Sequence, residues 1–256
     1  MNYNYHTHTY RCNHATGTPE EYIKIALKNG IKYMGFSDHI PFIYDDGYEA
    51  KWRVPFSEGR DYINEILDLK EKYSGEIEIK VGFEMEYFPT HFEKMLKTAR
   101  EFGAEYLIMG PHYVGSEFPN CRHVTNPSKS VERLEAYADT IIAAMKTGVF
   151  SYIAHPDMFN FTGNDDDYIK SAEKICKASK KLGVPIELNL LGIREKRCYP
   201  NLLFWKVAGK IKPPVTFGLD SHRAQDAFDR DSLIIAKQMV EKFSLNYIGK
   251  PQIIAV

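Results

Sequence analysis

The sequence of 256 residues predicts one α/β domain over 1–256, in which seven parallel strands alternate with seven helices as in an α/β barrel. Three observations lead to this prediction. Short apolar runs alternate with longer amphipathic segments along the whole chain. Several runs are apolar at almost every position, as expected for parallel strands that are covered on both faces. No linker, repeat or low-complexity tract marks a second domain.

The predicted strands are the apolar runs. The runs YLIMG at 106–110 and VTFGL at 215–219 show the continuous hydrophobicity most clearly. The helical segment between each strand and the next favours a parallel arrangement. We expect strands near residues 2–8, 32–37, 77–86, 105–112, 150–155, 184–190 and 215–220.

The predicted helices carry start and stop signals. Thr18 can cap the first of them, Pro19 suits its first turn, and Asn29–Gly30 ends it. We expect helices near residues 18–29, 57–73, 90–102, 130–146, 166–182, 200–209 and 225–243. The two longest connections, 40–56 and 113–129, follow strands at the end where barrel enzymes build their sites.

Composition narrows the class of protein. The net charge of −1 argues against a nucleic-acid-binding surface. The N-terminus shows no leader pattern and no apolar run could span a bilayer, so we expect a cytoplasmic protein without a membrane partner. None of the four cysteines forms a C-x-x-C pair, and we expect free thiols. The oligomeric state stays open.

Histidines and carboxylates gather at one end of the predicted strands. A parallel barrel brings all these strand ends to one rim, so residues far apart in sequence should form one cluster. Three pairs also have the i, i+2 spacing that places two side chains on the same face of a strand. The residues at the strand ends are His6, His8, Asp38, His39, Glu84, Glu86, His112, His155, Asp220 and His222.

This donor set predicts a metal cluster. Imidazole and carboxylate ligands without thiolates suit Zn²⁺, Fe²⁺ or Mn²⁺. A carboxylate such as Glu84 can bridge two ions, and such a pair favours phosphoryl chemistry. Asp38 could instead orient His39. We expect His91 and His123 to be surface or hydrogen-bonded core residues, since neither ends a strand.

The order of short motifs resembles the PHP (polymerase and histidinol phosphatase) superfamily. The motifs are HTH at 6–8, His14, SDH at 37–39, GFE at 82–84, GPH at 110–112, AHP at 154–156 and LDSH at 219–222. The resemblance implies a distorted (β/α)7 TIM-like barrel with a trinuclear metal centre. The run ELNLLGIR at 187–194, followed by Tyr199–Pro200, looks most like the histidinol-phosphatase branch. The chain departs from many members of that branch in having GLDSH at its last motif.

The same resemblance implies a division of the ligands among two or three divalent ions. Glu84 would be shared between the first two sites. The first ion would be held by His6, His8, Glu84 and Asp220, the second by Glu84, His112 and His155, and the third by His14, His39 and His222.

The expected reaction is hydrolysis of L-histidinol phosphate to L-histidinol and phosphate, a step of histidine biosynthesis, through attack of a metal-bridging hydroxide. We expect Asp220, His222 and Glu84 to take part in catalysis. A phosphate also calls for a planar cation. Arg194 is the first choice for that contact, and Arg197, Arg53 and Arg11 follow.

The rest of the substrate would need an acidic or aromatic pocket, for which Glu86, Trp52 and Tyr113 are candidates. Three alternatives stay open at this point. The chain could be a PHP-type phosphodiesterase or a phosphatase for another small phosphoester, a barrel amidohydrolase, or a metal-binding protein without enzymatic activity.

Overall fold

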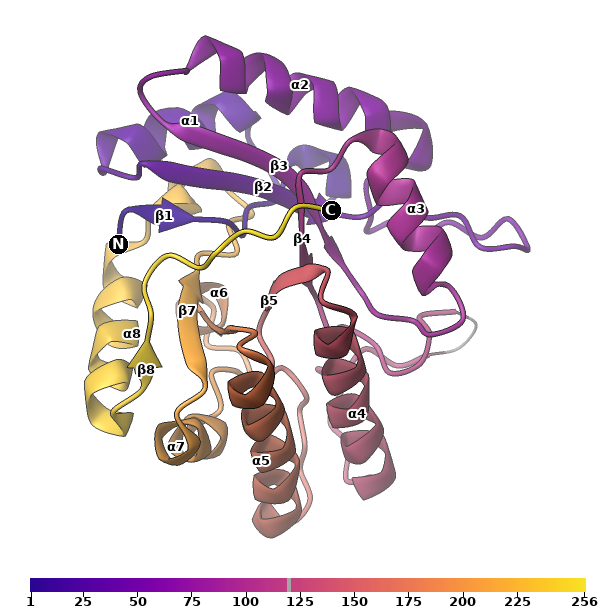
Figure 1. The fold of residues 1–256 in the computed structure, drawn as a ribbon, viewed down its shortest axis with the longest axis vertical. Helices are drawn as coiled ribbons and strands as arrows, with labels where there is room; N and C mark the ends of the chain where they lie inside the picture. Colours follow the sequence, from indigo (N-terminus) through magenta and orange to yellow (C-terminus); the bar gives the residue numbers. More distant parts are fainter. Residues whose placement is uncertain (119–120) are drawn as a thin grey trace.

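The computed structural model describes residues 1–118 and 121–256. Their parallel strands form one curled sheet in sequential order, with helices packed on its outer face (Figure 1). The strands are β1 (Tyr3–Asn4), β2 (Tyr33–His39), β3 (Glu78–Met85), β4 (Tyr106–Met109), β5 (Phe150–Ile153), β6 (Ile186–Asn189), β7 (Pro214–Gly218) and β8 (Asn246–Tyr247). The predicted class, an α/β fold with parallel strands, is confirmed.

The helices follow the strands in alternation. They are α1 (Pro19–Lys28), α2 (Gly59–Lys72), α3 (Phe92–Phe102), α4 (Val131–Thr147), α5 (Asp165–Leu182), α6 (Leu190–Arg194), α7 (Leu202–Ile211) and α8 (Arg230–Phe243). Three short 3-10 turns, η1 (Tyr10–Cys12), η2 (Phe56–Glu58) and η3 (Ala224–Ala227), lie in the connections. No helix within the described ranges is both long enough and apolar enough to cross a membrane.

The predicted strand count of seven is not confirmed, because the sheet has a short eighth strand. β8 pairs with β7 through Pro214–Asn246 and Val215–Tyr247. The predicted first strand is also shorter than 2–8, because its regular pairing with β2 ends at Asn4, although the N–H of Ser37 still donates to the Thr7 carbonyl at 2.9 Å. It turns instead towards the segment that follows β7, where Thr7 and Ser221 form an isolated parallel bridge. The first and seventh strands therefore meet at their C-terminal ends.

Local signals explain where the helices begin. The Thr18 hydroxyl accepts a hydrogen bond from the backbone N–H of Glu21, whose side chain accepts one from the N–H of Thr18, as in a capping box. The predicted last helix, 225–243, is divided. Its first turn is η3, and α8 begins after Asp229, whose carboxylate accepts from the N–H of Ser232. The cap at Asp229 sets the later start of that helix.

Two apolar regions hold the sheet. The larger one lies between the sheet and the helices. The smaller one fills the inside of the curl and consists of Tyr3, Tyr5, Tyr106, Ile108, Tyr152 and Ala154. The C-terminal tail runs from β8 between β7 and β1 to the middle of the view in Figure 1, and there Ile253 packs on this inner core and the N–H of Ile254 donates to Ser151 Oγ at 3.0 Å. The opposite, C-terminal end of the strands is left for polar side chains.

Candidate metal centre

The C-terminal ends of the strands deliver histidines and carboxylates to one cavity of about 700 Å³. His39 is the last residue of β2, and Glu84 is the last residue but one of β3. The other predicted ligands follow β1, β4, β5 and β7. His6 lies beneath the cavity and is fully buried. The predicted ligands that line the cavity are His8, His14, His39, Glu84, His112, His155, Asp220 and His222. The structure thus brings all the predicted metal ligands to one place.

Glu84 occupies the centre of the cluster. Its Oε1 faces the Nε2 atoms of His112 and His155, at 3.4 and 2.9 Å. Its Oε2 faces the Nε2 atoms of His6 and His8, at 3.6 and 3.5 Å. The two oxygens therefore face different sets of imidazoles, as expected for a carboxylate shared between two ions, and His39 also lies against Oε2.

Asp220 lies beside Glu84 and faces two of the same imidazoles. Its Oδ1 is 3.5 Å from His6 Nε2 and 3.4 Å from His8 Nε2. Asp220 has a positive φ of 48°, and His155 has one of 28°. Such a backbone costs about 1–2 kcal/mol for a residue with a side chain, and it tends to occur at functional sites.

Many buried donor and acceptor atoms in this cluster make no hydrogen bond within the described part of the chain. A buried polar atom without a partner costs about 1–3 kcal/mol, so a group of them around one point calls for a ligand. Imidazole nitrogens and carboxylate oxygens fit divalent first-row metals. The unpartnered atoms are Nε2 of His6 and His8, Nδ1 of His39 and His155, both oxygens of Glu84, and Oδ1 of Asp220.

Buried carboxylates orient three of the imidazoles from outside. His6 Nδ1 lies 2.9 Å from Glu187 Oε1, and His112 Nδ1 lies 2.6 Å from Glu86 Oε1. Each contact leaves the other ring nitrogen facing the cluster, the usual arrangement of a metal-binding histidine. In the same way, His8 Nδ1 lies 3.4 Å from Asp38 Oδ1.

Asp38 therefore supports His8. Its contact with His39, the residue it was expected to orient, is a hydrogen bond of 2.8 Å from the backbone N–H. His39 turns its Nδ1 towards Glu84 Oε2, at 3.2 Å.

Backbone carbonyls orient two further imidazoles, those of His14 and His222. His14 Nδ1 lies 2.7 Å from the carbonyl oxygen of Cys12, and His222 Nδ1 lies 3.2 Å from that of Asp220. The His14 ring lies 5.3 Å from that of His39 and 4.9 Å from that of His222. These three side chains could hold a cation of their own.

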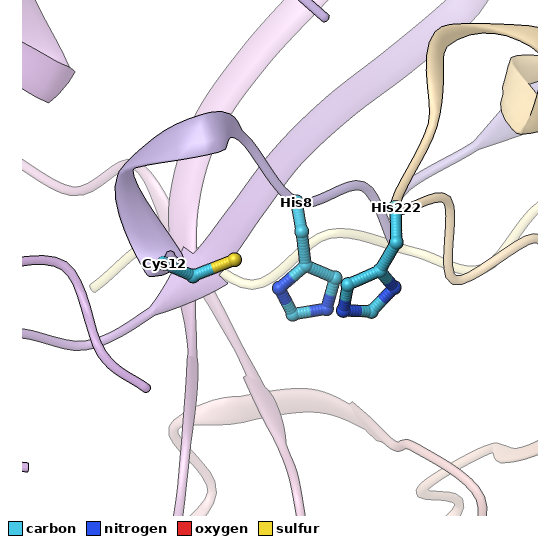
Figure 2. A group of neighbouring side chains, drawn as sticks. All are labelled: His8, Cys12 and His222. Carbon is cyan, nitrogen blue, oxygen red and sulfur yellow. The ribbon is translucent and has the colours of Figure 1, made fainter. Parts of the chain in front are cut away.

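Cys12 lies against this part of the cluster. Figure 2 shows its sulfur pointing towards the His8 ring, with His222 on the far side of that ring. The thiol donates to the carbonyl oxygen of Thr9 at 3.1 Å, and burial raises its pKa, which favours the protonated form. Cys12 is thus buried beside the predicted ligands, and it also lines the cavity.

Burial and neighbouring charges act in opposite directions on the pKa values of the cluster. Burial by itself would lower the pKa of His6, yet Asp220, Glu187 and Glu84 raise it well above the usual value. Burial would raise the pKa of Glu84, but the imidazoles of His112 and His6 hold it well below its usual value. Each of these contacts between an imidazole and a carboxylate therefore favours the charged form of both groups.

Sequence reasoning missed two residues at the end of β6. The carboxylate of Glu187 contacts His6 and accepts from the backbone N–H of His155 at 3.1 Å. The amide of Asn189 donates to Glu187 Oε2 at 2.8 Å and to Asp220 Oδ2 at 3.0 Å. Their i, i+2 spacing at a strand end is the signal that could have identified them.

His123 was expected to be a surface or core residue, and the structure places it at the cavity. Its ring lies 5.8 Å from that of His112, and its Nδ1 lies 2.7 Å from Thr125 Oγ1. Burial, His112 and His155 together lower its pKa to about 3. Its position in the 113–129 connection was the useful signal, because that segment follows β4 at the site.

The four predicted phosphate-binding arginines lie in different surroundings, and among them only Arg197 lines the cavity as described. Arg194 Nη1 donates to Asp229 at 3.0 Å and its Nη2 to the carbonyl oxygens of Leu219 and Asp220, so its donors point into the α8 side of the molecule. Arg11 pairs with Glu58 and Glu65.

Arg53 and Glu86 are buried against each other. Arg53 Nη2 lies 2.6 Å from Glu86 Oε2, and Glu117 also pairs with this guanidinium. Both oxygens of Glu86 are thus engaged, one by Arg53 and the other by His112. Neither residue lines the cavity, so the geometry does not favour direct substrate contact for either.

Comparison with known proteins finds a family model and curated relatives that match most of the chain. The family model described as "PHP domain" matches residues 4–190. A protein of Deinococcus radiodurans named "Probable histidinol-phosphatase" is 28% identical over 224 residues, which cover 85% of each chain. The histidinol-phosphatase of Bacillus subtilis is 24% identical over 253 residues, which cover 86% of this chain and 93% of the relative.

Solved structures share the fold. A Lactococcus lactis histidinol phosphate phosphatase, crystallised with Zn, L-histidinol and phosphate, superposes with a TM-score of 0.69 at 16% identity. The match covers 96% of this chain and 95% of that one.

Proposed function

The chain belongs to the PHP domain family, and we propose on that premise that it is a metal-dependent histidinol-phosphatase. The reaction is hydrolysis of L-histidinol phosphate to L-histidinol and phosphate. Curated relatives that match most of the chain are named for this activity. The observation that carries the proposal is the group of buried, unpartnered imidazole and carboxylate atoms around Glu84.

We assign the ligands as the family resemblance implies. Glu84 would be shared by two ions, because its Oε1 faces His112 and His155 while its Oε2 faces His6 and His8. Asp220 completes the first site, since it shares His6 and His8 with Glu84. The resulting sets are His6, His8, Glu84 and Asp220 for the first ion, Glu84, His112 and His155 for the second, and His14, His39 and His222 for the third.

The bound ions supply positive charge for the phosphoryl oxygens and make a water acidic enough to react near neutral pH. The protein's part is to hold the ligands rigidly. Glu187 and Glu86 fix the rings of His6 and His112, and Asn189 fixes the carboxylates of Glu187 and Asp220. Such outer contacts typically change metal affinity or activity by about 10–100-fold.

We assign the phosphate contact to Arg197 in place of Arg194. Arg197 lines the cavity, and its Nε and Nη2 donate to Glu195 Oε2 at 2.9 and 2.7 Å. Its Nη1 donates to the hydroxyl of Tyr199 at 3.2 Å, which leaves at least two N–H groups for a phosphate oxygen. Arg194 does not line the cavity, and its contacts with Asp229 and two carbonyl oxygens hold it on the α8 side of the molecule.

We also infer that the curled sheet is a distorted (β/α)7 barrel and that residues 1–256 form one domain. The bridge between Thr7 and Ser221 supports closure between the first and seventh strands. The two-residue β8 then counts as an addition at the N-terminal end of β7.

One experiment tests the proposed function directly. Elemental analysis of protein purified without chelator should find two or three divalent ions per chain. Turnover should be measured on L-histidinol phosphate, a nucleoside monophosphate, an aryl phosphate and a dinucleotide, with Mn²⁺, Zn²⁺ and Fe²⁺. L-Histidinol phosphate should be the best substrate, and faster cleavage of the dinucleotide would replace this proposal with a phosphodiesterase.

The bridging assignment needs a charge-removing variant and a matched control. Glu84→Gln keeps the size of the side chain and should lose both metal and turnover. Glu78→Gln changes the same residue type at the exposed start of the same strand and should behave as the wild type. Retention of the full metal complement in Glu84→Gln would remove the bridging role.

A further inference from the structure

An aromatic wall stands beside the metal ligands and has no part in binding metal. Trp52, Tyr113 and His123 line the cavity and are each half-buried. The Trp52 ring lies 6.0 Å from the ring of Tyr113, which lies 5.3 Å from that of His123. These rings come from the two long connections after β2 and β4.

The wall is close enough to the cluster to touch a bound phosphoester. The Trp52 ring lies 4.6 Å from that of His39 and 5.6 Å from that of His112. A phosphate group held at the ligands calls for positively charged partners, and the rings of Trp52 and Tyr113 carry no charge. Half-exposed aromatic faces in a cavity instead favour a flat organic group that stacks on them.

Arg53 holds Trp52 from outside the cavity. Its guanidinium carbon lies 4.3 Å from the centre of the Trp52 ring, and the side chain is only 1% exposed. Every nitrogen of the guanidinium has a partner. Nε and Nη2 donate to Glu117, Nη2 also donates to Glu86, and Nη1 donates to the carbonyl oxygen of Ile40 at 3.2 Å.

The same guanidinium supports a metal ligand. Glu86 accepts from Arg53 with one oxygen and contacts His112 Nδ1 with the other, at 2.6 Å each. One buried ion group therefore ties together the connection after β2, the end of β3 and the connection after β4. The aromatic wall and the imidazole of His112 have a common support, which fixes their spacing.

We propose that Trp52, Tyr113 and His123 form the subsite for the planar ring of the substrate, and that Arg53 is the positioning residue that keeps Trp52 beside the ligands. This inference rests on the proposed function, because it takes the substrate to be a phosphomonoester that bears an imidazole ring. On this proposal, the aromatic wall distinguishes phosphoesters that bear a ring from those that do not.

The test compares L-histidinol phosphate with O-phosphoethanolamine, which has the amine and the phosphomonoester but no ring. Loss of one aromatic stacking contact should raise KM for L-histidinol phosphate about three- to tenfold in Trp52→Leu, with a smaller change for O-phosphoethanolamine. Phe56→Leu is the matched control, because Phe56 is an exposed aromatic residue of the same connection that packs on Phe102. An unchanged ratio of kcat/KM values in Trp52→Leu would overturn the subsite.

A second readout does not need turnover. The chain has two tryptophans, and the other one, Trp205, is fully buried with its Nε1 bonded to Asp157. Titration of the metal-loaded protein with L-histidinol should change tryptophan emission in the wild type and leave it unchanged in Trp52→Phe. No response in the wild type counts against the subsite. A wild type that responds, holds metals and yet cleaves neither substrate would refute the phosphatase while keeping the ring subsite.

The role of Arg53 is tested with Arg53→Lys, which keeps the charge but loses the fork of donors. The ratio of kcat/KM values should fall as it does in Trp52→Leu. If this variant does not fold, Glu117→Gln removes partners of the same guanidinium and should give the same result. A folded variant with the wild-type ratio would remove Arg53 from the positioning role.

Discussion

Gly110 offers a test of the cluster that changes no ligand. It follows β4 and precedes His112 by two residues. A Cβ added there would lie 2.7 Å from Glu84 Cδ and 2.5 Å from His112 Cε1, and closer still to Glu84 Oε1. Non-bonded carbon atoms need about 3.5 Å, so Gly110→Ala should push Glu84 and His112 aside by about 1 Å each.

Such a shift should disable the site while the fold survives. A misplacement of about 1 Å in a catalytic site costs about 100-fold in rate, and we expect a loss of that order in kcat/KM. Elemental analysis should show that the ion between Glu84 and His112 is bound less fully. The assay is turnover of L-histidinol phosphate at saturating Mn²⁺, with circular dichroism to verify the fold.

A second glycine provides the matched control. Gly148 ends α4 with a φ of 72°, and a Cβ added there would meet nothing within 4 Å. Gly148→Ala should lower the free energy of unfolding by about 1 kcal/mol through backbone strain and leave turnover intact. Gly110→Ala with the full metal complement and kcat/KM within about threefold of the wild type would refute the geometry described here.

Three further predictions follow from the same contacts. Removal of the metals by a chelator should lower Tm in calorimetry, because ligands that bind only the folded state stabilise it, and an unchanged Tm would argue against bound ions. Affinity for Mn²⁺, measured by titration calorimetry, should rise with pH through neutrality, because the pKa values of His6 and His8 are raised and their protons must leave before metal binds. A pH-independent affinity would contradict this prediction. Arg194→Ala should cost about 2 kcal/mol of stability in a denaturant titration, because it removes the charged partner of Asp229, and it should not change KM. A raised KM would return Arg194 to the phosphate site.

The ligand cluster could be predicted from sequence because parallel strands share one polarity. His6, Glu84 and Asp220 lie far apart in the chain, yet each ends or follows a strand, and strand ends of one polarity meet at one rim. The i, i+2 spacing also carried information, although the chain had already left the sheet at His6. The common polarity of the strands therefore predicts that these ligands lie together.

The contacts around the ligands could not be predicted in this way. Arg194 follows β6 at the correct end of the sheet, but the single helical turn of α6 directs its side chain to Asp229. Asp38 could have oriented the imidazole of its neighbour His39, but it contacts only the backbone N–H of that residue and faces the imidazole of His8 on the adjacent segment. Such choices depend on which side chain of another element is nearest, and that requires coordinates.

The bridge between Thr7 and Ser221 has a consequence for the timing of synthesis. It joins segments that lie far apart in the sequence, and contacts of such long range form late because loop closure must precede them. A ribosome-bound nascent chain that stops short of His222 lacks part of the ligand set. Metal loading should therefore follow translation, and truncated chains released early should emerge without a complete centre to capture scarce ions.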